Sequence, residues 1–219
     1  MQLPAGTVIY NAEPFPQVWQ VFPQYADEVL RKYKVWDYNP ENAKRLSASL
    51  GKAVEYVPLG YVPELTRIEK TDPEDIDVLF YGTVNARRRT ILDRLEATGL
   101  KVNILCGVFG TERNAWIARS KVVLNVHSHE PGVFEIVRVA FLLANAKAVV
   151  SECNPGYAGE AVDADLLPGI VAAKYDDLVE ACVSLVADDD RRHAIEQAGF
   201  AAFQARRESD ILKNALAAS

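Results

Sequence analysis

The sequence lacks most of the features that place a chain in a specialised class of protein. Its 3 cysteines, Cys106, Cys153 and Cys182, have a wide spacing that fits neither a disulfide framework nor a zinc knuckle. No apolar run approaches the roughly 20 residues that cross a bilayer, and the N-terminus lacks the residue order of a signal peptide. We therefore expect a cytoplasmic protein with reduced thiols and no transmembrane segment.

The chain is also short of positive charge. Its 24 lysines and arginines face 30 aspartates and glutamates, which gives a formal net charge of −6 at pH 7. A general nucleic-acid binder would present a basic face, so we expect no nucleic-acid partner. The 49% hydrophobic and 25% charged residues are typical of a globular protein.

Short apolar runs alternate with amphipathic stretches, which predicts parallel βαβ units. In the first part of the chain we expect strands at residues 7–11, 34–38 and 53–58, and helices at 19–33 and 40–50. Asn39 is the expected N-cap of the second helix and Gly51 its stop. Residues 60–74 carry prolines and charges without a clear period and are the predicted linker.

The pattern restarts more strongly after the linker. We expect strands at residues 77–81, 101–106, 122–126, 148–151 and 169–173, and helices at 86–98, 111–119, 134–145, 175–187 and 189–218, with Gly99 as one C-cap. The predicted fold class is therefore α/β, with doubly wound, Rossmann-like parallel sheets. A reduced N-terminal lobe would span residues 1–65 and a complete C-terminal lobe residues 66–219.

Four segments follow strands of the C-terminal lobe, at the sheet edge where such folds bind ligands. The first passes from a strand through Gly82, Thr83 and Asn85 into a helix whose N-terminus favours phosphate. Arg88 and Arg89 would add bidentate contacts to a diphosphate. The alternative is that these arginines form a solvated basic helix face. Neither a Walker P-loop nor a GxGxxG pattern is present.

The second segment contains Gly107, Phe109 and Gly110 directly after the next strand. A turn of this kind can hold a planar base between backbone and apolar side chains. It can equally be a plain tight turn.

The third segment places His127, His129 and Glu130 after a buried strand. His-x-His at a strand end occurs in metal hydrolases. The other interpretations are imidazoles beside a phosphate or sugar hydroxyl, or ordinary loop histidines. His193, the one remaining histidine, stands in a charged C-terminal helix, so we expect no metal site.

The fourth segment opens an apolar helix with Glu135 and Arg138. Charges on such a helix need partners, because burying them unpaired is costly. Their i,i+3 spacing allows an internal pair. Alternatively Glu135 accepts hydrogen bonds from ribose hydroxyls, and Arg138 orients it or contacts phosphate.

This order of segments resembles the C-terminal domain of GT-B glycosyltransferases, the broad set called glycosyl transferases group 1, over residues 75–187. The resemblance lies in the strands that run into Gly82 and Gly107, in KVVLNVHSHE and in LLANAKAVVSE. Upstream, KVWDYNPENAKRL and VEYVPLGYVPEL are similar to the end of the family's N-terminal domain. The family's two glutamates separated by seven residues are not reproduced, because Arg138 stands eight positions after Glu130.

The resemblance implies transfer of a sugar from a nucleotide diphosphate sugar to a hydroxyl acceptor (a glycan, lipid-linked or protein), without a bound metal or other cofactor. It assigns Arg88 and Arg89 to the diphosphate, Glu135 to the ribose, and His127 or His129, with Glu130, to the sugar. Asp37 or Glu13 would be the catalytic base, although either can be a loop cap instead.

Residues 1–65 are about half of an ordinary domain. The chain is therefore a fragment, a minimal enzyme or a binding-only relative, or a partner chain or a second copy completes this lobe. Two alternatives to a glycosyltransferase remain. One is a non-catalytic nucleotide-binding or scaffold domain, and the other is a metal-dependent hydrolase that uses His127 and His129.

Overall fold

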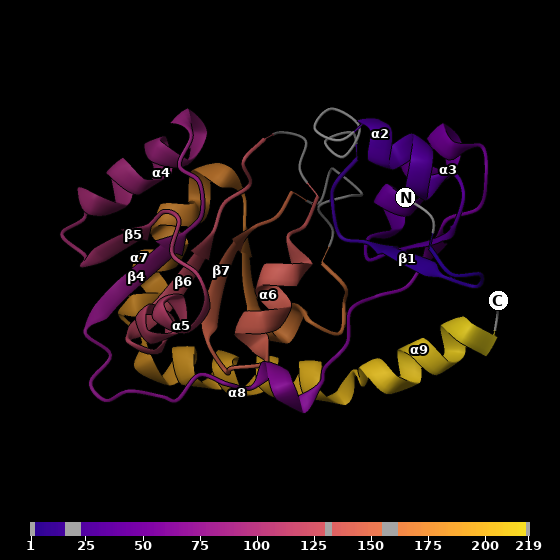
Figure 1. Cartoon of the computed structure of the whole chain (residues 1–219). Coiled ribbons are helices and arrows are strands. Elements are labelled where there is room, and N and C mark those ends of the chain that lie inside the picture. The colour runs from indigo at the N-terminus through magenta and orange to yellow at the C-terminus, as the bar shows by residue number, and fades with distance from the viewer. Residues whose placement is uncertain (1–2, 16–22, 130–132, 155–161, 218–219) are drawn as a thin grey trace. The chain divides into compact units, whose positions relative to one another are not determined.

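The computed structural model describes residues 3–15, 23–129, 133–154 and 162–217 (Figure 1). The chain forms two compact units. Unit 1 comprises Met1–Leu59 and Ser209–Ser219, and unit 2 comprises Gly60–Glu208. Both contain parallel sheets, so the predicted α/β class is confirmed. The lobe boundary expected after residue 65 stays a prediction.

Unit 1 contains a three-stranded parallel sheet in the order β1-β2-β3. The strands are β1 (Val8–Asn11), β2 (Lys34–Asp37) and β3 (Glu55–Tyr56). The helical elements are α2 (Pro23–Tyr25), the π-helical turn η1 (Ala26–Leu30) and α3 (Pro40–Leu50). A small apolar core of Leu30, Val35, Leu46 and Leu50 joins α3 to β2.

The ends of α3 lie where the sequence predicts them. The Asn39 side chain accepts hydrogen bonds from the backbone N–H groups of Glu41 and Asn42, and Gly51 adopts a left-handed conformation with φ of 67°. Two elements of unit 1 depart most from the prediction. The third strand has two residues rather than six, and the helix before β2 ends at Leu30 rather than residue 33. Part of that helix prediction, residues 16–22, lies outside the described residues.

Unit 2 contains five parallel strands in the order β5-β4-β6-β7-β8. The strands are β4 (Ile76–Tyr81), β5 (Val102–Leu105), β6 (Ser120–Asn125), β7 (Ala148–Glu152) and β8 (Ile170–Ala173). The α-helices are α4 (Ala86–Glu96), α5 (Gly110–Ala118), α6 (Ile136–Leu143), α7 (Leu178–Val186) and α8 (Asp189–Ala205). The 3-10 turns are η2 (Pro63–Leu65), η4 (Leu167–Gly169) and η5 (Tyr175–Asp177).

The five-stranded sheet is covered on both faces, as parallel sheets require (Figure 1). Val78 and Phe80 of β4 belong to one core with Leu92 of α4 and Cys182 of α7. Successive side chains of a strand point to opposite faces. Tyr81 accordingly meets arginines from α5 and α6 on the other face.

Several helix ends of unit 2 differ from the sequence prediction, and two of them bear on the expected caps and site. α4 ends at Glu96 with Ala97 as its C-cap, so Gly99, at φ of 84°, lies beyond the cap. α6 begins at Ile136, which leaves Glu135 in the N-cap position.

The predicted helix 189–218 is two helices, α8 and α9 (Glu208–Ala217), because Arg206 leaves helical geometry at φ −90° and ψ 72°. Tyr61 binds the backbone on both sides of this break: its N–H donates to the Arg206 carbonyl at 2.7 Å, and its carbonyl accepts from Glu208 N–H at 3.1 Å. The Glu208 carboxylate in turn accepts from Gly60 N–H at 2.5 Å.

The predicted linker, residues 60–74, is part of unit 2 and is held in place by other side chains of that unit. Asn145 accepts hydrogen bonds from the N–H groups of Arg67 and Ile68, both at 2.8 Å, and donates to the Leu65 carbonyl. Glu74 pairs with the buried Lys147 and with Arg192. The segment therefore has a defined path although it lacks regular secondary structure over most of its length.

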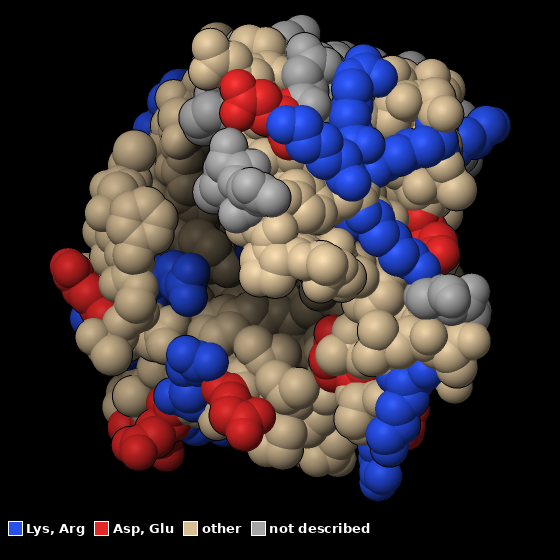
Figure 2. Space-filling model, turned by 45° about the vertical axis from the view of Figure 1, so that its right-hand side comes forward, with Lys and Arg blue, Asp and Glu red and all other residues tan. Residues whose placement is uncertain are grey.

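No helix among the described residues is long and apolar enough to span a membrane. On the face seen in Figure 2, Lys and Arg side chains lie in separate groups among Asp and Glu side chains. This mixture agrees with the modest net charge of the chain.

Candidate functional site

The order of the five strands places two loops side by side at the carboxyl edge of the unit 2 sheet. β4 has β5 on one side and β6 on the other, and the helices that follow β4 and β6 lie on opposite faces of the sheet. Open α/β sheets bind ligands at this kind of switch in strand order. The loop at residues 82–85 follows β4 and the loop at residues 126–129 follows β6. We take these two loops and the side chains around them as the candidate site.

Side chains at the start of α4 fasten the second loop to the first. Three of them each donate a hydrogen bond to one of three consecutive carbonyl groups of the second loop. The pairs are Arg88 Nε with Val126 (2.8 Å), Arg87 Nη1 with His127 (3.0 Å) and Asn85 Nδ2 with Ser128 (2.6 Å). Asn85 is also the N-cap of α4 and accepts from Arg88 N–H at 3.0 Å. The two loops are thus one connected structure.

Arg88 is built into this structure and is only 5% exposed. Besides its bond to Val126, it donates to the Thr83 carbonyl at 2.9 Å and forms an ion pair with Glu135 at 3.1 Å. Much of its hydrogen-bonding capacity therefore holds protein groups together. The assignment of Arg88 to a diphosphate stays a prediction.

Glu135 and Arg138 form the internal i,i+3 pair, with Glu135 Oε2 and Arg138 Nη2 at 3.4 Å. Arg138 also donates to Asn125 Oδ1 at 3.1 Å and lies over the Tyr81 ring at 4.8 Å. Because Glu135 also binds Arg88, one carboxylate faces two guanidinium groups. The local charge is positive, which favours an anionic ligand.

Gly82 lies next to the guanidinium groups of Arg88 and Arg138. Its φ of 136° is a backbone conformation that residues other than glycine rarely adopt. A Cβ atom at this position would lie 3.2 Å from Arg138 Nη2 and 3.7 Å from Arg88 Nη1. Glycine here therefore permits the close approach of the two arginines to the end of β4.

Glu152 completes the site, although the sequence prediction did not include it. It is 3% exposed, and its two oxygens bind Arg87 Nη1 and Nη2 at 2.7 and 2.5 Å. Its Oε2 also accepts from His127 N–H at 2.9 Å. Tyr175 stacks on Arg87 at 4.0 Å and donates from its hydroxyl to the Arg87 carbonyl.

Arg89 lies apart from this group. Its guanidinium pairs with Asp93 at 2.6 Å and with Glu96 at 2.5 Å along the exposed face of α4. Consecutive residues on a helix diverge by ~100°, so Arg87, Arg88 and Arg89 cannot share one direction.

The loop after β5 is a tight turn with two left-handed glycines, Gly107 at φ 73° and Gly110 at φ 61°. Between them Phe109 is 76% exposed. An exposed ring beside the sheet edge agrees with the predicted base-binding role, which stays a prediction.

The two histidines of the second loop differ in exposure. His127 is 1% exposed, whereas His129 is exposed, and Glu130 lies outside the described residues. Within the described ranges no group of three or more His, Cys, Asp or Glu side chains is arranged to hold a metal ion.

Asp37 lies in unit 1 and is fully buried. Its Oδ2 accepts from the side-chain amides of Asn11 and Asn42, both at 2.7 Å, and its Oδ1 from Asn39 N–H at 2.9 Å. Burial raises the pKa of Asp37 to about 6, and these hydrogen bonds act in the opposite direction. The contacts fit the role of a loop cap. The backbone carbonyl of Glu13, the other candidate base, accepts from Asn11 and Asn42.

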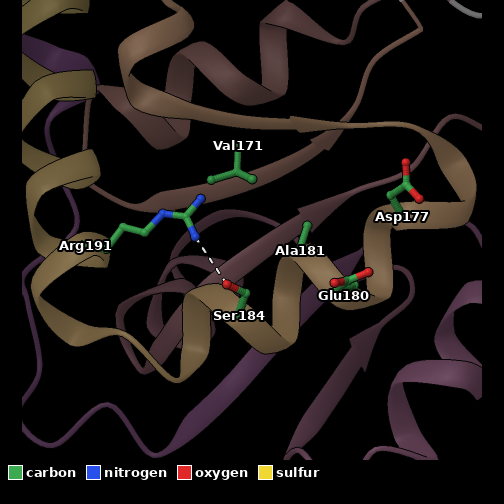
Figure 3. A pocket seen from close by; sticks show the side chains of 6 residues that line it. All are labelled: Val171, Asp177, Glu180, Ala181, Ser184 and Arg191. Atoms are coloured by element: carbon green, nitrogen blue, oxygen red, sulfur yellow. Dashed lines mark hydrogen bonds between the residues drawn. The ribbon is translucent and has the colours of Figure 1, made fainter.

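A separate shallow hollow of about 260 Å³ lies beside β8 and α7 (Figure 3). Its lining residues are Val171, Asp177, Glu180, Ala181, Ser184 and Arg191. Arg191 reaches across from α8 to Ser184, to which it donates at 3.2 Å. The hollow contains none of the predicted site residues, and its acidic and basic groups select no single ligand charge.

No protein-family model matches the chain. Its sequence is similar to uncharacterized proteins of Acanthamoeba polyphaga mimivirus. One is 31% identical over 162 residues, which cover 71% of this chain and 18% of the viral protein. Another is 31% identical over 139 residues, which cover 59% of this chain and 45% of that protein. The chain thus spans less than half the length of either.

Solved structures share the fold at low sequence identity. HepE of Anabaena, crystallised with UDP-glucose, matches 96% of this chain and 72% of its own, with a TM-score of 0.67 and 13% identity. The sucrose-phosphate synthase of Thermosynechococcus elongatus gives 0.59 at 14% identity, over 97% of this chain and 68% of its own. A UDP-forming α,α-trehalose-phosphate synthase of Burkholderia xenovorans gives 0.61 at 14%, over 96% and 67%. The α/β fold with parallel sheets is that of GT-B glycosyltransferases.

Proposed function

We propose that this chain binds a nucleotide diphosphate sugar at the carboxyl edge of the unit 2 sheet and transfers the sugar to a hydroxyl acceptor. The observation that carries the proposal is the meeting of the two loops at the switch between β4 and β6, in a fold shared with HepE over 96% of the chain. HepE has been crystallised with UDP and with UDP-glucose, which makes UDP the first ligand to test.

The charges around Gly82 support an anionic ligand. Arg88 and Arg138 approach this glycine and share the single carboxylate of Glu135. Arg88 is nearly enclosed, whereas the Arg138 side chain keeps 17% of its surface exposed. We assign Arg138 to the diphosphate, where a charge-assisted hydrogen bond would stabilise the leaving group without metal chemistry.

The remaining roles follow from exposure. His129 is the exposed last residue of the second loop and is the better placed of the two histidines to contact the sugar, because His127 is buried. Phe109 would stack on the base.

Binding of UDP, UDP-glucose and GDP to the whole chain, measured by calorimetry, tests the donor site. We expect UDP to bind and Arg138→Gln to weaken it by about tenfold or more, since a hydrogen bond to a charged group contributes about 1.5–3 kcal/mol. Arg94→Gln is the matched control, because Arg94 lies on the exposed side of α4 and donates to the Asp176 carbonyl. If none of the three nucleotides binds, the donor site is refuted.

Release of UDP from UDP-glucose in the presence of hydroxyl acceptors then tests transfer. UDP binding without turnover on any acceptor would favour the non-catalytic nucleotide-binding alternative.

A further inference from the structure

The ion pair between Arg87 and Glu152 holds the second loop of the site at His127. Glu152 accepts the His127 N–H at 2.9 Å, and Arg87 donates to the His127 carbonyl at 3.0 Å. The same Arg87 and Glu152 bind each other through two hydrogen bonds of 2.7 and 2.5 Å. Both backbone polar groups of His127 are therefore fixed by one bidentate pair.

This pair joins elements that are far apart in sequence. Arg87 belongs to the first turn of α4, Glu152 ends β7, and Tyr175 of η5 covers the guanidinium at 4.0 Å. The Glu152 side chain is 4% exposed and that of Arg87 17%. A buried bidentate pair has one low-energy geometry, so it holds the loop more closely than exposed charges would.

We infer that Arg87 and Glu152 are positioning residues that set the backbone of the loop at residues 126–129. The inference rests on the proposed function, because this loop forms one wall of the donor site. Neither residue needs to contact the nucleotide. Their effect on binding passes through His127 and its neighbours, whose carbonyls are drawn toward α4.

Amide hydrogen exchange measured by NMR tests the inference without any ligand. We expect Glu152→Gln to speed exchange at His127 N–H by about tenfold or more, because the amide loses a charged acceptor and its local opening becomes easier. Asp75→Asn is the matched control, since Asp75 forms a bidentate pair with Arg119 where the chain enters β4. Unchanged exchange at His127 in Glu152→Gln overturns the inference.

UDP affinity provides a second measurement. We expect Glu152→Gln and Arg87→Met each to raise the UDP dissociation constant by about tenfold. Because the two residues act as a unit, the double variant should raise the constant by much less than the product of the two single fold-changes. Arg87→Lys, which keeps the charge, should recover part of the affinity. A purely structural pair would lower the melting temperature and leave the affinity of the folded protein unchanged.

The two failures can be told apart. If the unmodified chain does not bind UDP, the proposed function falls, while the exchange rates still test the role of the pair. Tyr175→Phe is a milder variant for the case in which Glu152→Gln does not fold, because it removes only the hydroxyl that binds the Arg87 carbonyl. It should accelerate His127 exchange in the same direction, and no change would count against the inference.

Discussion

The protonation of Asp37 should make the stability of unit 1 depend on pH. Burial raises the pKa of this carboxyl from 3.8 to about 6 in the folded chain. A raised folded-state pKa means that the folded protein binds the proton more tightly than the unfolded chain. The stability contributed by the protonated group is therefore complete below pH 3.8 and is lost as the pH rises through about 6. At about 1.4 kcal/mol per pH unit, the loss is at most about 3 kcal/mol.

The variant Asp37→Asn isolates this effect because its side chain stays neutral. Asp37 accepts hydrogen bonds from the side-chain amides of Asn11 and Asn42 and from the Asn39 N–H. The substitution removes one of the acceptor oxygens, and the cost of this change is the same at every pH. Between about pH 4 and pH 8, we expect the free energy of unfolding of the unmodified chain to fall by up to about 3 kcal/mol relative to that of Asp37→Asn. Urea unfolding at each pH measures this difference. A carboxyl titration by NMR reads the pKa directly. A difference that is constant with pH would show that the three hydrogen bonds offset burial, and would refute the reasoning.

Three further substitutions test the packing and charge of unit 2. Gly199→Ala should destabilise the protein by about 1–3 kcal/mol in urea unfolding, because a Cβ there would lie 2.8 Å from Leu143 Cδ2 and 2.9 Å from Gly169 Cα; an unchanged midpoint would contradict this contact. Gly82→Ala should lower the free energy of unfolding by about 1–3 kcal/mol, because an alanine would be strained at φ of 136°. It should also weaken UDP binding by displacing Arg138, and full UDP affinity in calorimetry would argue against the close approach of Arg138 to this position. Arg138→Gln should make UDP binding less sensitive to salt, and an identical slope of log Kd against log salt would show that Arg138 carries no ligand charge.

Local signals in the sequence were enough for much of the architecture. The alternation of apolar runs predicts the eight strands found among the described residues. Asn39 predicts the start of α3 because its side chain bonds to the first turn of the helix that follows it. The pair Glu135–Arg138 is one of the two alternatives that the sequence left open, and the i,i+3 spacing accounts for it wherever the helix packs.

The remaining features depend on partners far along the chain. Arg87 finds Glu152 65 positions later, and nothing in the sequence near Arg87 distinguishes it from Arg88 or Arg89. Only the direction of each side chain on α4 decides that Arg87 binds β7, that Arg88 binds Glu135 and that Arg89 faces Asp93. Glu152 is the last residue of a buried strand, and a buried charge requires a partner. This position was the signal in the sequence that could have identified Glu152 as part of the site.

The contact between Gly60 and Glu208 has a consequence for how this protein can be taken apart. These residues are the first and last of unit 2, and a hydrogen bond of 2.5 Å joins the N–H of one to the carboxylate of the other. The first and last residues of the segment 60–208 therefore lie next to each other. Such a segment suits circular permutation, with the old ends joined by a short peptide and new ends opened in an exposed turn. Gly60 sets the condition for that design, because a side chain at this position would meet the backbone of Arg206 and Glu208 within 2.7 Å.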